Sequence, residues 1–234
     1  MNQLHAPTQL FRSSWSLYDA VIDGNYMFHR ELHACVRPVI AARAALGSYA
    51  LLDLGCGNAR CLAETLTAFP PAHYVGADLS RAALDGAALA LESLPALELR
   101  EEDMLRCAEQ VRPGLFDLVY SGFAMHHLAT AEKERLFRAV AAALSPGGQF
   151  LLVDVLREEG ESRERFLDRY LRMIREEWRT LTAEQVEEVR EHITHHDFPE
   201  NFPVLAEMAR ACGLGMVRRL VGHGPHHGLA FSGL

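Results

Sequence analysis

Two glycines one residue apart mark the stretch of this chain with the clearest chemical potential. Gly55 and Gly57 follow the apolar run Leu51–Leu54, which contains Asp53, and they precede a helical pattern that starts at Ala59. A short apolar run that ends in glycine predicts a buried strand followed by a tight turn. Because glycine lacks a Cβ atom, a ligand can contact the backbone of this turn, and the first amides of the helix point towards that ligand. Many α/β proteins contain such a turn, so by itself it predicts a small-molecule site and no particular ligand.

Polar residues also follow the next predicted strands. Asp78 ends the second strand, at about the distance from the glycines where an acid can bind both hydroxyls of a ribose. Asp103 and Met104 follow the third strand, where a carboxylate and a thioether suit the amino group and the ring of an adenine. Ser121 ends the fourth strand. Since ligands bind beyond the carboxyl ends of the strands in a doubly wound sheet, we expect these residues to surround one site.

The elements that must position these residues alternate between strand and helix, which predicts a parallel sheet with helices on both faces. Ser80 and Thr130 are expected helix caps, and Thr182 with Gln185 has the spacing of a capping box. A charged stretch after residue 156 carries an apolar stripe that should pack on the N-terminal helices, and 192–199 is expected to be irregular. Strands are predicted at 50–54, 74–78, 97–99, 116–121, 149–155, 216–221 and 229–232, and helices up to about residue 47, at 81–94, and from residues 130, 182 and 203.

Composition favours a soluble globular protein of one domain. The chain has 234 residues, a hydrophobic share of 49%, a charged share of 23% and a net charge of −8, which argues against a nucleic-acid partner. No apolar run predicts a membrane span or a secretory signal. The five scattered cysteines favour reduced thiols and a cytoplasmic location. The predicted organisation is a single domain, 1–234, with an N-terminal helical cap (1–47), a cofactor-binding core (48–155), a helical insertion (156–202) and a final helix and strands (203–234).

The strand-end residues together resemble the class I S-adenosylmethionine-dependent methyltransferases of the bacterial small-molecule type. The resemblance covers most of 50–155, and the matching stretches are Leu51–Gly57, Tyr74–Ser80, Glu102–Met104, Phe116–Leu128 and Leu144–Val155. A dehydrogenase is disfavoured because Arg60 occupies the position of the third glycine of its fingerprint. No lysine followed by serine or threonine completes a nucleotide-triphosphate loop.

The resemblance implies a Rossmann-like seven-stranded sheet whose last strand is antiparallel, with S-adenosylmethionine as cofactor. Carried over by residue, Gly55 and Gly57 pass the backbone along the methionine part of the cofactor, with Cys56 as a small loop residue and not a nucleophile. Asp53 binds the amino group directly or through water. The remaining cofactor contacts would be Asp78 and Leu79 at the ribose, Asp103 and Met104 at the adenine, and Ser121 and Gly122 at the amino-acid end.

The methyl acceptor is less well defined. The stretch after the fourth strand lacks the motifs of base methylation, and Asp154 is not followed by the asparagine of a magnesium-dependent catechol-type enzyme. It contains instead His126 and His127, either of which could transfer a proton or simply pack near the cofactor. In the N-terminal helices, Tyr18 and Tyr26 with His29 are candidates to line the reaction chamber, with helix packing as the alternative role.

Two further histidine clusters stand out, namely His192, His195 and His196, and His223, His226 and His227. His192 and His196 have the spacing of zinc ligands on a helix, but no third ligand is fixed in sequence, so no metal site is predicted; a polar pocket wall or surface packing are the alternatives. The predicted function is methylation of a small polar metabolite on oxygen, nitrogen or sulfur. RNA or protein methylation and non-catalytic cofactor binding are the alternatives, and the sequence predicts no oligomeric state.

Overall fold

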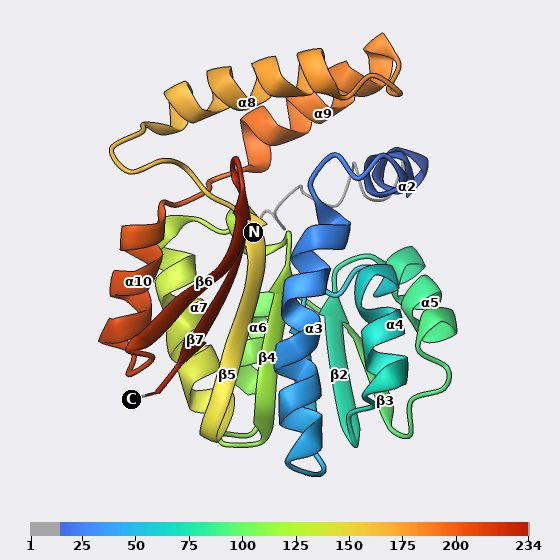
Figure 1. Cartoon of the computed structure of the whole chain (residues 1–234), viewed down its shortest axis with the longest axis vertical. Helices are drawn as coiled ribbons and strands as arrows, with labels where there is room; N and C mark the ends of the chain where they lie inside the picture. The colour runs from blue at the N-terminus through green and yellow to red at the C-terminus, as the bar shows by residue number, and fades with distance from the viewer. Residues whose placement is uncertain (1–14, 234) are drawn as a thin grey trace, which may run out of the picture.

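The protein, seen here as a computed structural model that describes residues 15–233, is organised around a seven-stranded sheet with the order β3-β2-β1-β4-β5-β7-β6 (Figure 1). β7 pairs antiparallel with both β5 and β6, whereas the other neighbouring strands run parallel. The predicted sheet and its antiparallel last strand are therefore confirmed. The strands are β1 (Ala50–Leu54), β2 (His73–Asp78), β3 (Leu97–Glu101), β4 (Phe116–Gly122), β5 (Leu144–Val155), β6 (Met216–His223) and β7 (His226–Ser232).

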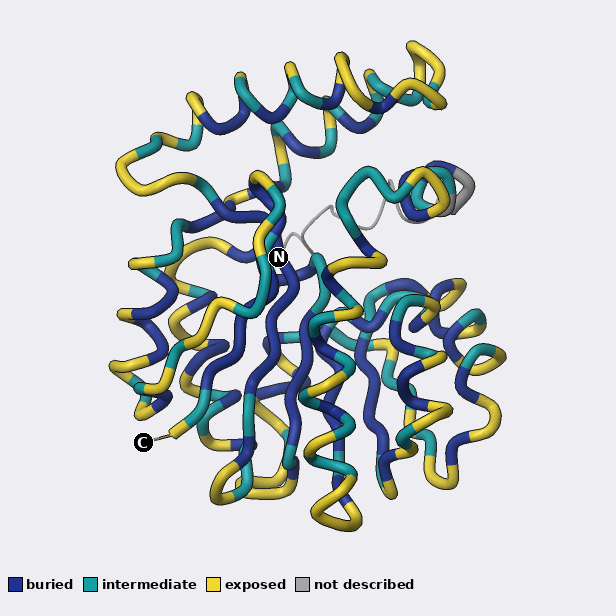
Figure 2. The backbone as a smooth tube through the Cα atoms, in the orientation of Figure 1, coloured by how far each residue is buried: buried dark blue, intermediate teal, exposed yellow. Residues whose placement is uncertain are grey.

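Helices cover both faces of the sheet, and each face has its own apolar core. α3 (His29–Ala45), α4 (Arg60–Ala68) and α5 (Arg81–Ala90) pack on one face. α6 (Met104–Gln110), α7 (Thr130–Ala143) and α10 (Phe202–Ala211) pack on the other. The central strands are buried along nearly their whole length, while the outer faces of the helices are exposed (Figure 2). Burial on both faces explains why these strands read as continuous apolar runs.

Several local predictions need correction. Thr130 is the first residue of α7 and not its cap: its hydroxyl donates to Glu200, while Glu132 accepts a hydrogen bond from the backbone of Ala129. The helix expected over 81–94 ends at Ala90. β5 begins at Leu144 and not at Gln149, because Leu144 pairs with Phe116 before a register shift. The predicted caps at Ser80 and Thr182 are confirmed.

A helical lid lies across the carboxyl ends of the strands (Figure 1). It consists of α2 (Trp15–Asp23), α8 (Arg163–Glu177) and α9 (Ala183–His196). Their apolar faces form one cluster, in which Leu17 and Val21 of α2 meet the α8 stripe, as predicted. The histidines at 192–196 belong to α9 and are not irregular, because Val189 and Ile193 extend its apolar face into this cluster. None of the helices described is both long enough and apolar enough to cross a bilayer.

The two ends of the insertion that carries α8 and α9 are held together. The backbone N–H of Arg157 donates to the Glu200 carbonyl at 3.0 Å, and the Arg157 guanidinium contacts the Glu200 carboxylate at 2.9 Å. The same guanidinium donates to the carbonyl of Pro199 at 2.6 Å. Both side chains are largely buried. We refer to these contacts as the Arg157–Glu200 clasp.

Candidate functional site

The glycine loop between β1 and α4 is held against β2 by its own backbone. The N–H groups of Gly55 and Cys56 donate to the Ala77 carbonyl at 2.9 and 3.0 Å. Gly55 has a φ of 75°, and a Cβ atom there would lie 2.3 Å from the Cβ of Ala124. Only glycine satisfies both constraints, so the close approach of the β1 and β4 loops depends on this residue.

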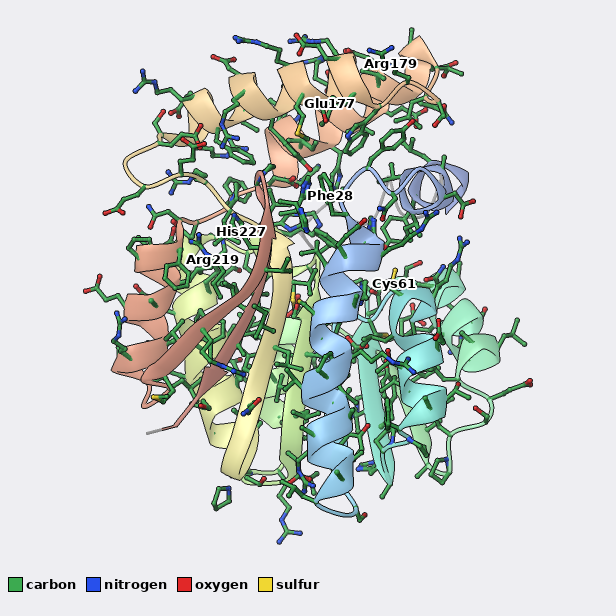
Figure 3. The ribbon with its side chains drawn as sticks, in the orientation of Figure 1. Phe28, Cys61, Glu177, Arg179, Arg219 and His227 are labelled. Atoms are coloured by element: carbon green, nitrogen blue, oxygen red, sulfur yellow. The ribbon has the colours of Figure 1, made fainter. Side chains whose placement is uncertain are left out.

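A cavity opens between the loops that follow β1 and β4, where the strand order reverses. This is the position at which doubly wound sheets bind ligands. Cys61 lines it from the first turn of α4 (Figure 3). Of the residues predicted from sequence, the cavity brings together Asp53, Gly55, Cys56, Gly122, Tyr18 and His29.

Asp53 is the buried charge of this cavity. Its Oδ2 accepts a hydrogen bond from the Tyr74 hydroxyl at 2.8 Å, whereas its Oδ1 is buried without a partner. Burial raises the pKa of Asp53 to about 7. A cationic amino group would satisfy Oδ1 and stabilise the carboxylate, so the residues present fit the amino-acid end of S-adenosylmethionine.

The other predicted cofactor residues lie at the ends of β2, β3 and β4, where several also stabilise the loops. Asp78 accepts the backbone N–H groups of Gly57 and Ser80 at 2.9 and 2.8 Å. Asp103 caps α6 by accepting the N–H of Arg106 at 3.0 Å. Carboxylate oxygens have further lone pairs, so these bonds leave capacity for ribose and adenine, and those roles stay predictions. Leu79, Met104 and Gly122 are half-buried beside them, and Ser121 is buried, with its hydroxyl donating to the Leu54 carbonyl at 2.9 Å.

A second pocket lies between this cavity and the lid. Its volume is about 660 Å³ including its open mouth. Tyr18 and Phe123 line both the cavity and this pocket, so the two spaces adjoin. Phe123 has a φ of 52°, an uncommon conformation for a bulky residue, and it is fixed by donation to the Val153 carbonyl at 2.7 Å. The lining is Leu17, Tyr18, Val21, Met27, Phe123, His126, His127, Tyr170, Trp178, Val189, His192, Ile193 and Asp197.

The polar part of the pocket is a group of histidines around Asp197. His126, in the 3-10 turn η1 (Met125–His127), is buried and hydrogen-bonds through Nδ1 to Asp154. Burial lowers the pKa of His126, but the carboxylates of Asp154 and Asp197 outweigh it, and the pKa lies above its ordinary value. Burial and the neighbouring His127 imidazole lower the pKa of His192 to about 3.

The predicted catalytic residues divide into two groups. His126, His127 and Tyr18 line the pocket. His29 is buried beside Phe123 in the adjoining cavity, with neither ring nitrogen hydrogen-bonded, and burial lowers its pKa to about 4. Tyr26 instead joins the turn between α2 and α3 to the segment between α8 and α9.

The contacts of Tyr26 show how it does so. Its ring stacks on Trp178 with the ring centroids 5.2 Å apart. Its hydroxyl pairs with the Thr180 hydroxyl at 2.6 Å and accepts the Thr180 N–H at 2.8 Å. Met27, the next residue, lines the pocket.

Several residues that the structure places in or near the site were not assigned from the sequence. Asp154 stood out only as a carboxylate inside an apolar strand, and Asp197 was hidden in a stretch expected to be irregular. Lys133, the one lysine of the chain, is buried and donates to the carbonyls of Leu128 and Phe198, which join α7 to the segment after α9. His226, one of the clustered histidines noted in the sequence, is buried, and its Nε2 lies 2.9 Å from the Tyr170 hydroxyl. Nearby, Phe28 at the start of α3 stacks on His223 of the β6–β7 hairpin (Figure 3).

The sheet order, the antiparallel β7 and a cavity at the β1–β4 reversal define a class I methyltransferase fold. Comparison with known proteins agrees: residues 52–150 match a family model described as a methyltransferase domain. Residues 52–150 are thus similar to a methyltransferase domain, and S-adenosylmethionine is the cofactor that this fold and the matched family imply.

The individual proteins that resemble this chain are distant from it in sequence. An uncharacterized methyltransferase of Synechocystis sp. is 33% identical over 107 residues, which are 46% of this chain and 47% of the relative, so the match spans about half of each. The PH0226 protein of Pyrococcus horikoshii has a similar structure, with a TM-score of 0.58 and 16% identity over 88% of this chain and 91% of that one. The S-adenosylmethionine-dependent methyltransferase SibL gives a TM-score of 0.54 and 19% identity over 84% of this chain and 54% of that one. At these identities, the structures show the shared fold alone.

Proposed function

We propose that this protein transfers a methyl group from S-adenosylmethionine to an oxygen, nitrogen or sulfur atom of a small molecule. The observation that carries the proposal is the pocket under the lid, which adjoins the cofactor cavity through Tyr18 and Phe123. Its walls are mostly aromatic and aliphatic, and its polar groups are concentrated at the histidines and Asp197. Because of this lining, we expect a metabolite with a compact apolar body, which contacts the apolar walls, and one polar group, which is methylated.

The chain contributes positioning and exclusion of water. When bound, the cofactor supplies a methyl group on a cationic sulfur, which loses its charge as the methyl is transferred. Asp53 and the glycine loop hold the amino-acid end, and Phe123 and Tyr18 line the junction across which the acceptor approaches. The lid excludes water from that junction, which preserves the alignment of the reacting atoms. A proton acceptor is needed only for a protonated acceptor group, and His126 and His127 are the predicted candidates.

Charge and enclosure both favour a small partner. A net charge of −8 disfavours an RNA backbone. The pocket lies beneath α8 and α9, and its walls are mostly apolar with a few polar groups, as in ordinary small-molecule sites. A small-molecule partner without nucleic acid or membrane is accordingly part of the proposal.

Labelled cofactor with fractionated metabolites would test this function. We expect label in a small-molecule fraction, and label only in RNA or protein fractions would contradict the proposal. Val189→Trp fills the pocket from α9 and should abolish transfer while calorimetry shows unchanged cofactor binding. Leu89→Trp, on the exposed face of α5, is the matched control and should retain both. Equal loss of methyl transfer in both variants would contradict the assignment of this pocket as the binding site of the methyl acceptor.

A further inference from the structure

His126 and His127 of η1 and Asp197 at the end of α9, which is far from them in the chain, point ligand atoms at one small volume. These atoms all lie within 4.8 Å of one another. Oδ1 of Asp197 is 3.2 Å from Nδ1 of His127 and 3.7 Å from Nε2 of His126. In a tetrahedral zinc site with bonds of about 2.0–2.1 Å, neighbouring ligand atoms are about 3.3–3.4 Å apart. The two separations from Asp197 lie close to this value and no separation exceeds 4.8 Å, so side-chain rotation would bring the three atoms around one ion.

Asp197 gives an independent reason to expect a cation. The residue is 4% exposed, and its Oδ1 is buried without a hydrogen bond of normal geometry. A third imidazole nitrogen, Nε2 of His192, lies 3.7 Å from the same oxygen. A buried carboxylate is costly unless a hydrogen bond, a positive charge or a metal compensates it.

The residues around the group fix its geometry in the way that supporting residues do in metal sites. Asp154 holds Nδ1 of His126, so Nε2 is directed at the shared volume. The backbone N–H of Phe198 donates to the His126 carbonyl at 2.8 Å and joins the two ligand segments. Arg163 donates to the Asp197 carbonyl at 2.7 Å. The arrangement is thus held by contacts that involve no metal.

We infer that His126, His127 and Asp197 form a binding site for a divalent transition metal, best matched by Zn²⁺, whose fourth coordination position faces the pocket. Two imidazoles and a carboxylate are zinc ligands, and three protein ligands with an open position are typical of catalytic sites. The sequence predicted no metal because it offered only His192 and His196, whereas two of the ligands come from the turn after β4.

The site itself rests on geometry, and its role rests on the proposed function. A hydroxyl or thiol of the acceptor that binds the ion releases its proton more readily, to water at the open mouth of the pocket and before the methyl is transferred. The acceptor atom then forms a bond to the methyl carbon while the carbon–sulfur bond breaks and its electron pair stays on sulfur. Nε2 of His126 cannot bind the ion and accept a proton at once, so this assignment replaces the role of His126 as a base.

Metal binding is measurable without the acceptor. The full chain, freed of any affinity tag and stripped with a chelator, is titrated with Zn²⁺ in competition with a chromogenic chelator. We expect one ion per chain, and at least about 100-fold weaker affinity for Asp197→Asn and His127→Ala, since even supporting residues change affinity 10–100-fold. His195→Ala is the matched control: His195 is exposed near the end of α9, two residues before Asp197, and lies outside the group, so the affinity of this variant for Zn²⁺ should stay within about twofold of the wild type.

Two outcomes would overturn the site: no binding above background, or equal weakening in Asp197→Asn and His195→Ala, each shown to be folded by circular dichroism. The open position is tested with Co²⁺-loaded protein and imidazole as the probe. A shift in the visible spectrum on addition of imidazole would support an open coordination position. An unchanged spectrum would contradict a role of the ion in binding the acceptor. Calorimetry with the demethylated cofactor is run in parallel, so failure of the metal site is distinguishable from failure of the proposed function.

Discussion

The cofactor half and the lid half of the site are built by different means. In the cofactor half, each functional residue lies at or just beyond the end of a strand, and the sheet and its loops position it through the backbone. In the lid half, Tyr18, His126, Asp154 and Asp197 come from separate segments and are held by side-chain contacts. A backbone-positioned site can be recognised in short motifs, which is why the family model matches 52–150 and ends before the lid. A site assembled from side chains leaves no such local pattern.

This difference predicts different consequences of substitution. Changes in the glycine loop should affect folding and cofactor affinity together, because the same backbone serves both. Changes in the lid should affect turnover more than cofactor affinity. The substitutions below test this contrast, beginning with the largest expected effect.

Among substitutions that add a single methyl group to the cofactor half, Gly55→Ala should lower the free energy of unfolding most. It places a side chain at a φ of 75° and 2.3 Å from Ala124, which together should cost about 2–5 kcal/mol of the free energy of unfolding. Gly114→Ala is the matched control, because its φ of 69° is similar but its Cβ would meet open space, so about 1–2 kcal/mol is expected. Denaturant unfolding and calorimetry with the cofactor measure both effects. Equal costs for the two variants would show that the approach of the loops does not matter.

Lys133→Met tests a buried cation of the lid half. At neutral pH it leaves the carbonyls of Leu128 and Phe198 without their donor, and we expect a loss of about 1–3 kcal/mol. Arg135→Met, exposed on the same helix, should change stability by less than about 0.5 kcal/mol.

The pH dependence of the Lys133 effect has a definite sign. Burial lowers the pKa of Lys133 to about 8 from an ordinary 10.5, so between these values the unfolded chain binds more protons than the folded one. The wild type should therefore gain stability relative to Lys133→Met as pH rises from about 8 to 10.5, by up to about 3 kcal/mol. Unfolding of both proteins across this range cancels the contributions of cysteines and tyrosines. A constant difference would contradict the lowered pKa.

Two substitutions of Tyr26 test whether this residue acts in the reaction or holds the lid closed. Tyr26→Phe keeps the stacking on Trp178 and loses the bonds to Thr180, so turnover should fall about 3–10-fold, corresponding to about 1 kcal/mol. Tyr26→Ala should lower it further, and neither should change cofactor affinity by more than about twofold. Unchanged turnover in both variants would exclude either role.

Asp103→Ser should have the smallest effect on folding. Serine preserves the cap of α6, so the free energy of unfolding should change by less than about 0.5 kcal/mol. If the carboxylate also binds the adenine, cofactor affinity should fall about 10-fold, as expected for a hydrogen bond to a charged group. Asp103→Ala, which removes both, is the companion variant. Unchanged cofactor affinity in Asp103→Ser would leave this residue a cap alone.

The sequence predicted the sheet, its last strand and the cofactor loop because each depends on local patterns. It missed Asp154 as a partner of His126, since their contact joins the ends of β4 and β5 and has no fixed spacing in the chain. It also treated 192–199 as irregular, because polar histidines interrupt the apolar period of α9. The placement of Asp197 against η1 depends on the fold of the insertion, which no short motif describes.

The Arg157–Glu200 clasp has a consequence for how such proteins can diversify. Because the insertion leaves and rejoins the sheet at one closed point, a change in its length does not require a shift of the strands below. Loop-closure entropy rises only slowly with length, so replacing the helical pair by a longer or shorter one costs little once both ends are fixed. We therefore expect the insertion to be exchangeable between relatives when it is transferred together with its clasp. Such an exchange would change the preference for the methyl acceptor and leave the cofactor-binding core unchanged.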